Sequence, residues 1–521
     1  MRGLDTPVRK VRRKVFTEIA RLGFANRPET LISDIEEIPY KIVQEKASYR
    51  ESIYRERAVV NERVRLAMGM SLRPENRAVH VTSGIEASNI DEKYYEPPLL
   101  QVIPSGCDAC EPKTYEVSNM CRGCMAHPCT SVCPKNAVSM KNGRSYIDQE
   151  KCIKCGKCKA VCPYDAIAKK ERPCARACGV NAIESDSLGR AAINSEKCVS
   201  CGMCMVSCPF GAIADKSQIY QLAKALAEGK EIIAEVAPAF VGQFGETVTA
   251  AQLKTGLLQM GFSDLYEVAL GADIGCVTEA HHYANHVLTG ELPFLLTSCC
   301  PSWTKLARKY FPDMIQHISQ ELTPMVATAR SIKQEHPEAK EIKLENLPET
   351  PLHDSATAAG RGYAVAGGVT DAIRSCLKAY YPEVTPRIEH AEGLAECRKI
   401  LAVAKSGKLN GCLIEGMACP GGYGRSRNEC FLEGGKRTAE EVCERDRGES
   451  SGQRTGGNPA SIRNRKKKTG GRRHRKTEWF SCAGAFCIVF LNKSRYNREK
   501  MCSKITRRTQ YAGTILLPEC G

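Results

Sequence analysis

Sixteen of the chain's 29 cysteines lie between Cys107 and Cys208, at short and regular spacings. Two runs have the form C-x2-C-x2-C-x3-C-P, and a third has the same form with one gap widened to four residues. These runs are Cys152, Cys155, Cys158, Cys162; Cys198, Cys201, Cys204, Cys208; and Cys121, Cys124, Cys129, Cys133. With this spacing one loop supplies three thiolates to a 4Fe–4S cubane, while the fourth cysteine serves a partner cluster. The chemistry expected is one-electron transfer.

This crossing rule predicts four clusters that use all sixteen cysteines. The predicted sets are Cys121, Cys124, Cys129 with Cys162; Cys152, Cys155, Cys158 with Cys133; Cys198, Cys201, Cys204 with Cys178; and Cys208 with Cys107, Cys110, Cys174. Zinc knuckles are the alternative, because C-x2-C pairs also bind zinc. The Cys-Pro endings, each followed within four residues by an Ala-Val or Ala-Ile pair, favour iron–sulfur clusters.

A second group of cysteines follows two predicted strands. Thr297-Ser298-Cys299-Cys300-Pro301-Ser302-Trp303 comes after one strand, and Glu415-Gly416-Met417-Ala418-Cys419-Pro420-Gly421-Gly422 comes after another. Ligands of open α/β sheets bind at the carboxyl ends of the strands, so both loops are expected to meet over one site. The alternative is simple burial, since free cysteine is among the most buried residue types.

At these two motifs the chain resembles the iron-only (FeFe) hydrogenases, over residues from about 101 to 422. Its N-terminal extension and polyferredoxin module are similar to those of one bacterial subgroup. Members of this family bind an H-cluster, a 4Fe–4S cubane bridged through a cysteine to a two-iron centre that carries CO and CN⁻. The resemblance implies reversible reduction of protons to H2, with ferredoxin or another redox protein as electron partner.

The resemblance also implies roles for individual residues. Cys300 and Cys419 would be cubane ligands, and Cys299 the thiol that delivers protons to the two-iron centre. Glu279 and Ser319 stand where the family places proton-relay residues, and His282 stands where a second relay glutamate is common. A histidine can also carry protons, with a reference pKa of about 6.5. The alternative for Glu279 is a solvated helix face.

The chain departs from the family at two points. The family motif Pro-Cys-x-x-Lys, which supplies a further cubane cysteine, is missing after Lys340, and no cysteine occurs between Cys300 and Cys376. Tyr423 stands where the family has the cysteine that bridges the cubane to the two-iron centre. Only Cys300 and Cys419 of four expected ligands are therefore present, so we predict that the chain as written cannot hold an intact H-cluster.

The charge distribution offers a cause for the second departure. Residues 423–521 hold 23 Lys and Arg against 10 Asp and Glu, whereas the other 422 residues hold 52 against 49. If the Arg and Ser residues that follow residue 422 have AG-type codons, a one-base shift of the reading frame there gives a run of small residues, as the family has after its bridging cysteine. We interpret the tail as out of frame, the alternative being a genuine basic tail, and the gap after Lys340 as a deletion or gene-model error. The nearly neutral body gives no support for nucleic-acid binding.

Hydrophobic periodicity completes the expected organisation. Residues 1–100 form a charged helical region, 101–215 an α+β ferredoxin-type domain, 216–422 a truncated α/β FeFe-hydrogenase-like domain with parallel sheets, and 423–521 a basic, disordered or out-of-frame tail. Strands are predicted at 231–239, 265–270, 292–298 and 412–415. No run of about 18 apolar residues is present, so no membrane span is expected. The absence of a signal segment and the cysteine usage predict a cytoplasmic protein.

Three functions follow from these features. The first is a hydrogenase whose written sequence is defective. The second is a non-catalytic 4Fe–4S electron-transfer protein with a vestigial hydrogenase domain. The third is an iron–sulfur assembly scaffold, which the sixteen ferredoxin-type cysteines disfavour.

Overall fold

The computed structural model divides the chain into two units. Unit 1 comprises residues 1–15 and 27–221 and unit 2 residues 16–26 and 222–521, so the division passes through helix α1 (Pro7–Ala25). The structure describes residues 6–90, 97–240, 249–335, 356, 358–363 and 365–420, and the strand 486–490. Within the predicted tail, only the strand 486–490 is described. Tyr423, the other residues of the tail and the residues around the missing motif lie outside these ranges.

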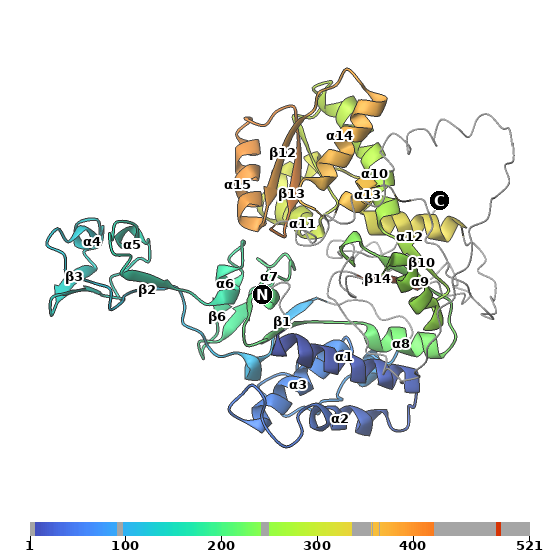
Figure 1. Cartoon of the computed structure of the whole chain (residues 1–521), viewed down its shortest axis with the longest axis horizontal. Helices are drawn as coiled ribbons and strands as arrows, with labels where there is room; N and C mark the ends of the chain where they lie inside the picture. Colours follow the sequence, from blue (N-terminus) through green and yellow to red (C-terminus); the bar gives the residue numbers. More distant parts are fainter. Residues whose placement is uncertain are drawn as a thin grey trace, which may run out of the picture. The chain divides into compact units, whose positions relative to one another are not determined.

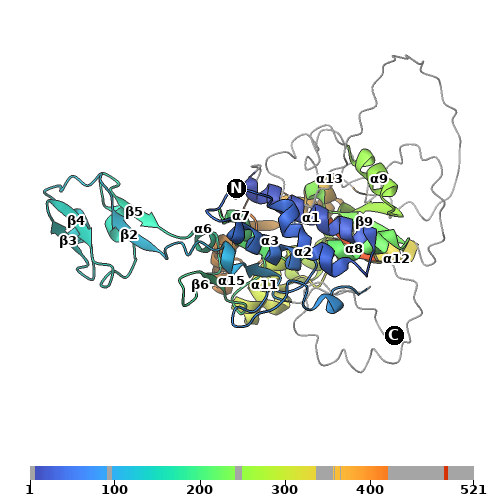
Figure 2. The same ribbon diagram turned by 90° about the horizontal axis from the view of Figure 1, so that it is seen from below.

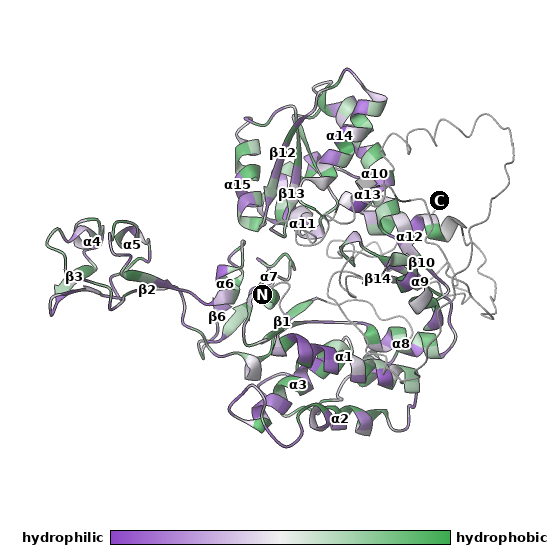
Figure 3. Cartoon of the chain, in the orientation of Figure 1, coloured by the Kyte–Doolittle hydropathy of each residue, from purple (hydrophilic) through white to green (hydrophobic). Residues whose placement is uncertain are grey.

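Unit 1 begins with helices. These are α1, α2 (Leu31–Ile42), α3 (Ile53–Ala67) and the short η1 (Ile85–Ala87). Leu31, Ile35 and Ile38 recur at helical spacing and are buried, so α2 presents one apolar face to its neighbours. The many hydrophilic residues of α1 and α3 appear purple in Figure 3, in keeping with the charged composition expected for this region.

The cysteine-rich part of unit 1 is built from four antiparallel strand pairs. These are β1 (Leu100–Val102) with β8 (Ile213–Asp215), β2 (Thr114–Val117) with β5 (Ile167–Lys170), β3 (Val138–Lys141) with β4 (Arg144–Ile147), and β6 (Ile183–Ser185) with β7 (Ala191–Ile193). Between them lie η2 (Pro104–Gly106), α4 (Pro128–Ser131), α5 (Lys157–Ala160), α6 (Pro173–Arg176) and α7 (Met203–Ser207). Helix α4 contacts α5 and β3, and α5 contacts β5. Figure 1 shows α4 and α5 next to each other, near β3 and β2, and Figure 2 shows the two strand pairs β2–β5 and β3–β4.

Each of the four short helices in this part carries one buried cysteine, namely Cys129, Cys158, Cys174 and Cys204. Two small apolar cores enclose them, one around Tyr115 and Ile167 and the other around Leu100 and Ile213. Few large apolar side chains are available here, so cysteine sulfurs occupy places that aliphatic residues fill in an ordinary core.

Unit 2 contains two sheets. The first has the order β10-β9-β14 and comprises β9 (Ile232–Val236), β10 (Asp264–Glu267) and β14 (Phe486–Phe490). Strands β9 and β10 are parallel, and β14 is antiparallel to β9. The associated helices are α8 (Ile219–Ala227), η3 (Pro238–Phe240), α9 (Ala250–Gln259) and α12 (Pro324–Glu335). A capping box between Thr249 and Gln252 fixes the start of α9.

The second sheet has the order β11-β13-β12, with all strands parallel. Its strands are β11 (Phe294–Leu296), β12 (Arg387–Glu392) and β13 (Cys412–Met417), and its helices and turns are α10 (Ala269–His282), η4 (Tyr283–Val287), α11 (Pro301–Tyr310), η5 (Pro312–His317), α13 (Ala358–Gly362), α14 (Gly368–Tyr380) and α15 (Leu394–Lys405). One core joins β11 and β13 to α10 and α14.

The structure confirms a small domain of short helices and antiparallel strand pairs around the cysteines, followed by a region with parallel strands. Three predicted strands extend too far: the one expected over 231–239 ends at Val236, the one over 265–270 ends at Glu267 because α10 begins at Ala269, and the one over 292–298 is limited to Phe294–Leu296. Strand β12 was not predicted, since its burial is low and it has no continuous apolar run. No helix among the described residues is long and apolar enough to cross a membrane.

Candidate functional site

Two of the predicted cysteine sets are brought together in unit 1. Burial raises the pKa of Cys158, and the neighbouring Cys152, Cys133 and Cys155 raise it further. Burial likewise raises the pKa of Cys204 to about 12, with further increases from Cys201, Cys198 and Cys178. In each case the neighbours are the three other members of one predicted set. A positively charged iron cluster reverses this effect, because it binds the thiolate form.

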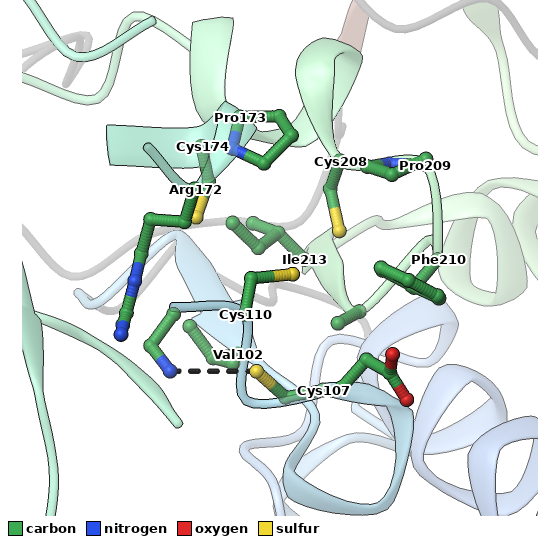
Figure 4. A pocket seen from close by; sticks show the side chains of 13 residues that line it. Val102, Cys107, Cys110, Arg172, Pro173, Cys174, Cys208, Pro209, Phe210 and Ile213 are labelled. Atoms are coloured by element: carbon green, nitrogen blue, oxygen red, sulfur yellow. Dashed lines mark hydrogen bonds between the residues drawn. The ribbon is translucent and has the colours of Figure 1, made fainter. Parts of the chain in front are cut away.

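The set of Cys107, Cys110, Cys174 and Cys208 lines one pocket of unit 1. Figure 4 shows the four sulfur atoms turned toward this shared space. Burial raises the pKa of Cys174 to about 11, and the nearby Cys208 and Cys107 also raise it. The remaining wall is mostly apolar and includes Val102 and Ile213.

In the predicted set of Cys121, Cys124, Cys129 and Cys162, one residue, Ser145, contacts two members. The backbone N–H of Ser145 donates to Sγ of Cys121 at 3.4 Å, and its hydroxyl lies 3.4 Å from Sγ of Cys129. That Cys124 and Cys162 complete this set remains a prediction.

Backbone N–H groups point at the cysteine sulfurs throughout this region. Three cysteines accept a hydrogen bond from the N–H of the residue four positions later. Cys133 and Cys162, which end runs, accept from Ala137 at 3.2 Å and from Ala166 at 3.4 Å, and Cys178 accepts from Ala182 at 3.2 Å. Such donors stabilise the thiolate over the thiol, and hydrogen bonds to sulfur also tune the potential of a bound cluster.

The cysteine loops share an unusual backbone conformation. In four cysteine loops, the residue before the second cysteine of the first C-x2-C pair has a positive φ; these residues are Ala109, Gly123, Lys154 and Ser200. Three of these are not glycine, and a non-glycine residue with positive φ costs about 1–3 kcal/mol. Four loops that repeat one strained conformation indicate a common task, which is to curl the chain around a ligand of one shape.

In unit 2, Cys300 and Cys419 lie together at the carboxyl ends of β11 and β13, as predicted. Burial raises the pKa of the Cys300 thiol, whereas the backbone N–H groups of Ala418 and Trp303 donate to its sulfur and lower it. Cys300 is the N-cap of α11, so its sulfur also lies at the positive end of that helix. The net pKa of Cys300 remains raised, so without a bound metal the thiol form is favoured, and the two N–H groups are placed to stabilise its sulfur as a metal ligand.

Cys299, Glu279 and Ser319 also meet in this region. Glu279 is 3% exposed, accepts a hydrogen bond from Ser298 N–H at 3.3 Å and is hydrogen bonded to Ser319. Burial raises the pKa of Glu279 to about 7 despite these two hydrogen bonds. Burial also raises the pKa of Cys299 well above its ordinary value, and the nearby Glu279 contributes. A carboxyl with a pKa near neutrality can both accept and donate a proton.

His282 lies further along the same side of α10. Its ring stands 4.8 Å from that of His286, and burial is the main cause that lowers its pKa, with Glu321 acting in the opposite sense. Glu321 also neighbours Glu279. Over the residues that the structure describes, no three His, Cys, Asp or Glu side chains are gathered around a position for a single metal ion, and the histidines at 281, 282 and 286 form no such group.

Two residues near this site were not predicted. Glu415 is 1% exposed and accepts hydrogen bonds from Gly367 N–H, Thr370 N–H and the Thr370 hydroxyl at 3.0, 2.9 and 2.9 Å, so it caps the start of α14. Tyr363 has a buried hydroxyl without a hydrogen-bond partner among the described residues, close to Cys299 and Glu279. Glu415 begins the sequence run that contains Cys419, which could have indicated that it lies near the site. No feature of the sequence indicated Tyr363.

Comparison with known protein families gives three matches. The C-terminal domain of the iron-only hydrogenase large subunit matches residues 230–341 and 337–423, a 4Fe–4S binding domain matches 145–168, and the LdpA Fe–S cluster-binding domain matches 168–219. The hydrogenase match thus has two stretches, which meet next to Lys340, and it ends at Tyr423.

Three curated relatives agree with these matches. Iron hydrogenase 1 of Clostridium pasteurianum is 29% identical over 142 residues, which are 25% of this chain and 24% of the relative. The periplasmic Fe hydrogenase large subunit of Nitratidesulfovibrio vulgaris is 31% identical over 189 residues, 34% of this chain and 42% of the relative. Electron transport protein HydN of Escherichia coli K12 is 40% identical over 62 residues, which are 12% of this chain and 35% of the relative. The chain spans less than half the length of each.

Proposed function

We propose that this chain, an FeFe hydrogenase-like protein with a ferredoxin module, transfers electrons through four 4Fe–4S clusters and, as written, lacks a complete H-cluster. The observation that carries the proposal is the contrast between the two cysteine regions. The sixteen cysteines of unit 1 are predicted to form four sets of four, and the members of three of these sets lie near one another, whereas the site in unit 2 offers the neighbouring thiols of Cys300 and Cys419.

The four sets suit 4Fe–4S cubanes. Each supplies the four thiolates that a cubane requires, and the loops direct N–H groups at the sulfurs. When bound, such clusters accept and release single electrons. The protein's own part is to exclude water from the buried sulfurs of Cys129, Cys158, Cys174 and Cys204, and to fix their positions by the strained loops.

The residues of unit 2 do not fit a complete H-cluster. The other described cysteines of unit 2 are Cys276, Cys376, Cys397 and Cys412, all buried. None of these four occupies a position of the missing ligands in the family motifs. We therefore derive no hydrogen chemistry for this chain. We expect a corrected sequence to restore the activity of the FeFe hydrogenase family, the reversible reduction of protons to H2.

Two features of the hydrogenase match support a defective reading frame. The match breaks next to the position where Pro-Cys-x-x-Lys is expected, and it ends where tyrosine replaces the bridging cysteine. Cys299, Glu279 and Ser319 nevertheless retain the arrangement of a proton path, with one carboxyl whose pKa is near neutrality. A site that keeps its proton path but lacks its metal ligands is the expected result of a recent lesion.

The electron partner is a ferredoxin or another small redox protein. Support comes from the ferredoxin-type module and from relatives that are named as electron-transport proteins and hydrogenases. The proposal includes a cytoplasmic location, because clusters assemble from reduced cysteines and a reducing compartment keeps cysteines reduced.

Anaerobic purification followed by reductive titration tests this function. The proposal predicts uptake of about four electrons per chain, one for each cubane, reversible oxidation by a ferredoxin, and no H2. CO and CN⁻ infrared bands or H2 evolution from the chain as written would overturn the incomplete H-cluster. Resequencing the locus from the codon for Pro324 to the stop separately tests the reading-frame explanation.

A further inference from the structure

Cys276 and Cys376 form a buried pair of thiols that the proposed function does not use. They lie 100 residues apart in sequence, on α10 and α14, and their Sγ atoms are 3.2 Å apart. Their side chains are 2% and 1% exposed and belong to the core that joins these helices. From this juxtaposition we propose that the pair is an oxidation site, at which peroxide forms a reversible disulfide between α10 and α14.

The contact is close enough for bond formation without a change of fold. A disulfide has an S–S length of about 2.05 Å, so the two sulfurs must approach by roughly 1.2 Å. Each sulfur moves by rotation about a single side-chain torsion, which needs little displacement of the helix backbone. The Cys276 thiol donates to the carbonyl of Asp273 at 3.1 Å, which leaves its sulfur lone pairs facing Cys376.

The burial of the pair limits which oxidant can reach it. Cys276 and Cys376 are 2% and 1% exposed, and the Tyr363 hydroxyl lies near both. A protein disulfide cannot reach such buried sulfurs, whereas a molecule of the size of hydrogen peroxide can reach them when the core opens locally.

The reaction balances with peroxide as the oxidant. One cysteine sulfur attacks the O–O bond and becomes a sulfenic acid, releasing water. The second sulfur then attacks the sulfenic sulfur, the S–S bond forms and a second water leaves. Overall, the two thiols lose two protons and two electrons, and one peroxide takes up both to become two waters.

The disulfide would tie together two helices that shape the site. Helix α10 carries Glu279 and His282, and the start of α14 is held by Glu415. The crosslink closes a loop of about 100 residues, which restricts the unfolded chain and raises the unfolding temperature of unit 2. Oxidation thereby fixes α10 against α14, and reduction releases it.

Differential thiol labelling of the full anaerobically prepared chain tests the proposal. After exposure to graded hydrogen peroxide, the protein is denatured in an alkylating reagent, and each cysteine is quantified by mass spectrometry before and after reduction. Cys276 and Cys376 should lose their free thiols together, at lower peroxide than Cys412, and a peptide linking them should appear. Cys412 is a suitable reference because it is equally buried in the same unit.

Variants separate this pair from general oxidation. In Cys412→Ala the linked peptide and the rise in unfolding temperature should persist, and in Cys376→Ala both should be lost. The proposal is overturned if Cys276 and Cys376 are still free thiols, and so still react with the alkylating reagent, at a peroxide concentration that oxidises Cys412. It is also overturned if each of the two is oxidised separately to a sulfinic acid. The labelling of the unsubstituted chain decides the question even where a variant does not fold.

Discussion

Replacing Glu279 with glutamine should change how the stability of unit 2 depends on pH. The carboxyl is buried, and its pKa is raised from 4.5 to about 7. The native carboxyl thus stays protonated up to about pH 7, whereas in the unfolded chain it ionises above about pH 4.5. Ionisation therefore favours unfolding, and the stability present below pH 4.5 is lost as the pH rises to 7. At about 1.4 kcal/mol per pKa unit, the loss is about 3 kcal/mol.

Glutamine keeps the size of the side chain and an acceptor for Ser298 N–H, but it does not ionise. Relative to the unsubstituted chain, Glu279→Gln should gain stability across pH 4.5–7 and reach a plateau above pH 7. Urea unfolding can be followed by the fluorescence of Trp303, which is fully buried and donates to the Thr297 carbonyl at 3.0 Å. Trp479, the other tryptophan, is replaced by phenylalanine in every sample.

Glu396→Gln, at an exposed position of α15, controls for the exchange of a carboxyl for an amide. The reasoning fails if the stability difference for Glu279→Gln does not vary over pH 4.5–7, or if it decreases as the pH rises. Either result would mean that the native carboxyl is ionised and is not the neutral proton carrier inferred above.

Two further predictions concern burial and backbone strain. Glu235 on β9 is fully buried, and neither carboxyl oxygen has a hydrogen-bond partner among the described residues, so burial raises its pKa to about 8. The free energy of unfolding should therefore fall by roughly 3–5 kcal/mol as the pH rises from 4.5 to 8. Glu235→Met should remove this fall, as measured by urea unfolding. Gly156 and Gly202 occupy equivalent positions in two cysteine runs with φ of +80° and +76°, but a Cβ at Gly156 would meet the Tyr115 hydroxyl at 2.5 Å and one at Gly202 would meet nothing. Gly156→Ala should therefore lower the unfolding temperature and cluster retention more than Gly202→Ala, and equal effects would mean that the contact with Tyr115 is unimportant.

Much of the fold followed from periodicity and spacing. Short apolar runs between helical patterns predicted β9, β11 and β13, because strands buried on both faces in parallel sheets are continuously apolar. The strand predicted to end at Leu270 was too long, since apolar residues continue from β10 into α10 and a strand cannot be separated from a buried helix by hydrophobicity alone. Strand β12 lacked any such signal.

The sites were predictable where local spacing determines geometry. A C-x2-C loop places its sulfurs by its own backbone, so the sets containing Cys158 and Cys204 could be assigned in advance and their members do lie together. The pairing of Cys276 with Cys376 could not be predicted, because it depends on the packing of two helices 100 residues apart. The pKa of Glu279 likewise depends on burial, which the sequence does not reveal.

Iron analysis of the anaerobically reconstituted chain tests the central claim most directly. Four cubanes predict about sixteen iron atoms per chain, with an equal amount of acid-labile sulfide. A complete H-cluster would add about six irons to give about twenty-two, and that result would contradict the inferred loss of ligands. A value near eight would contradict the four-cluster module itself.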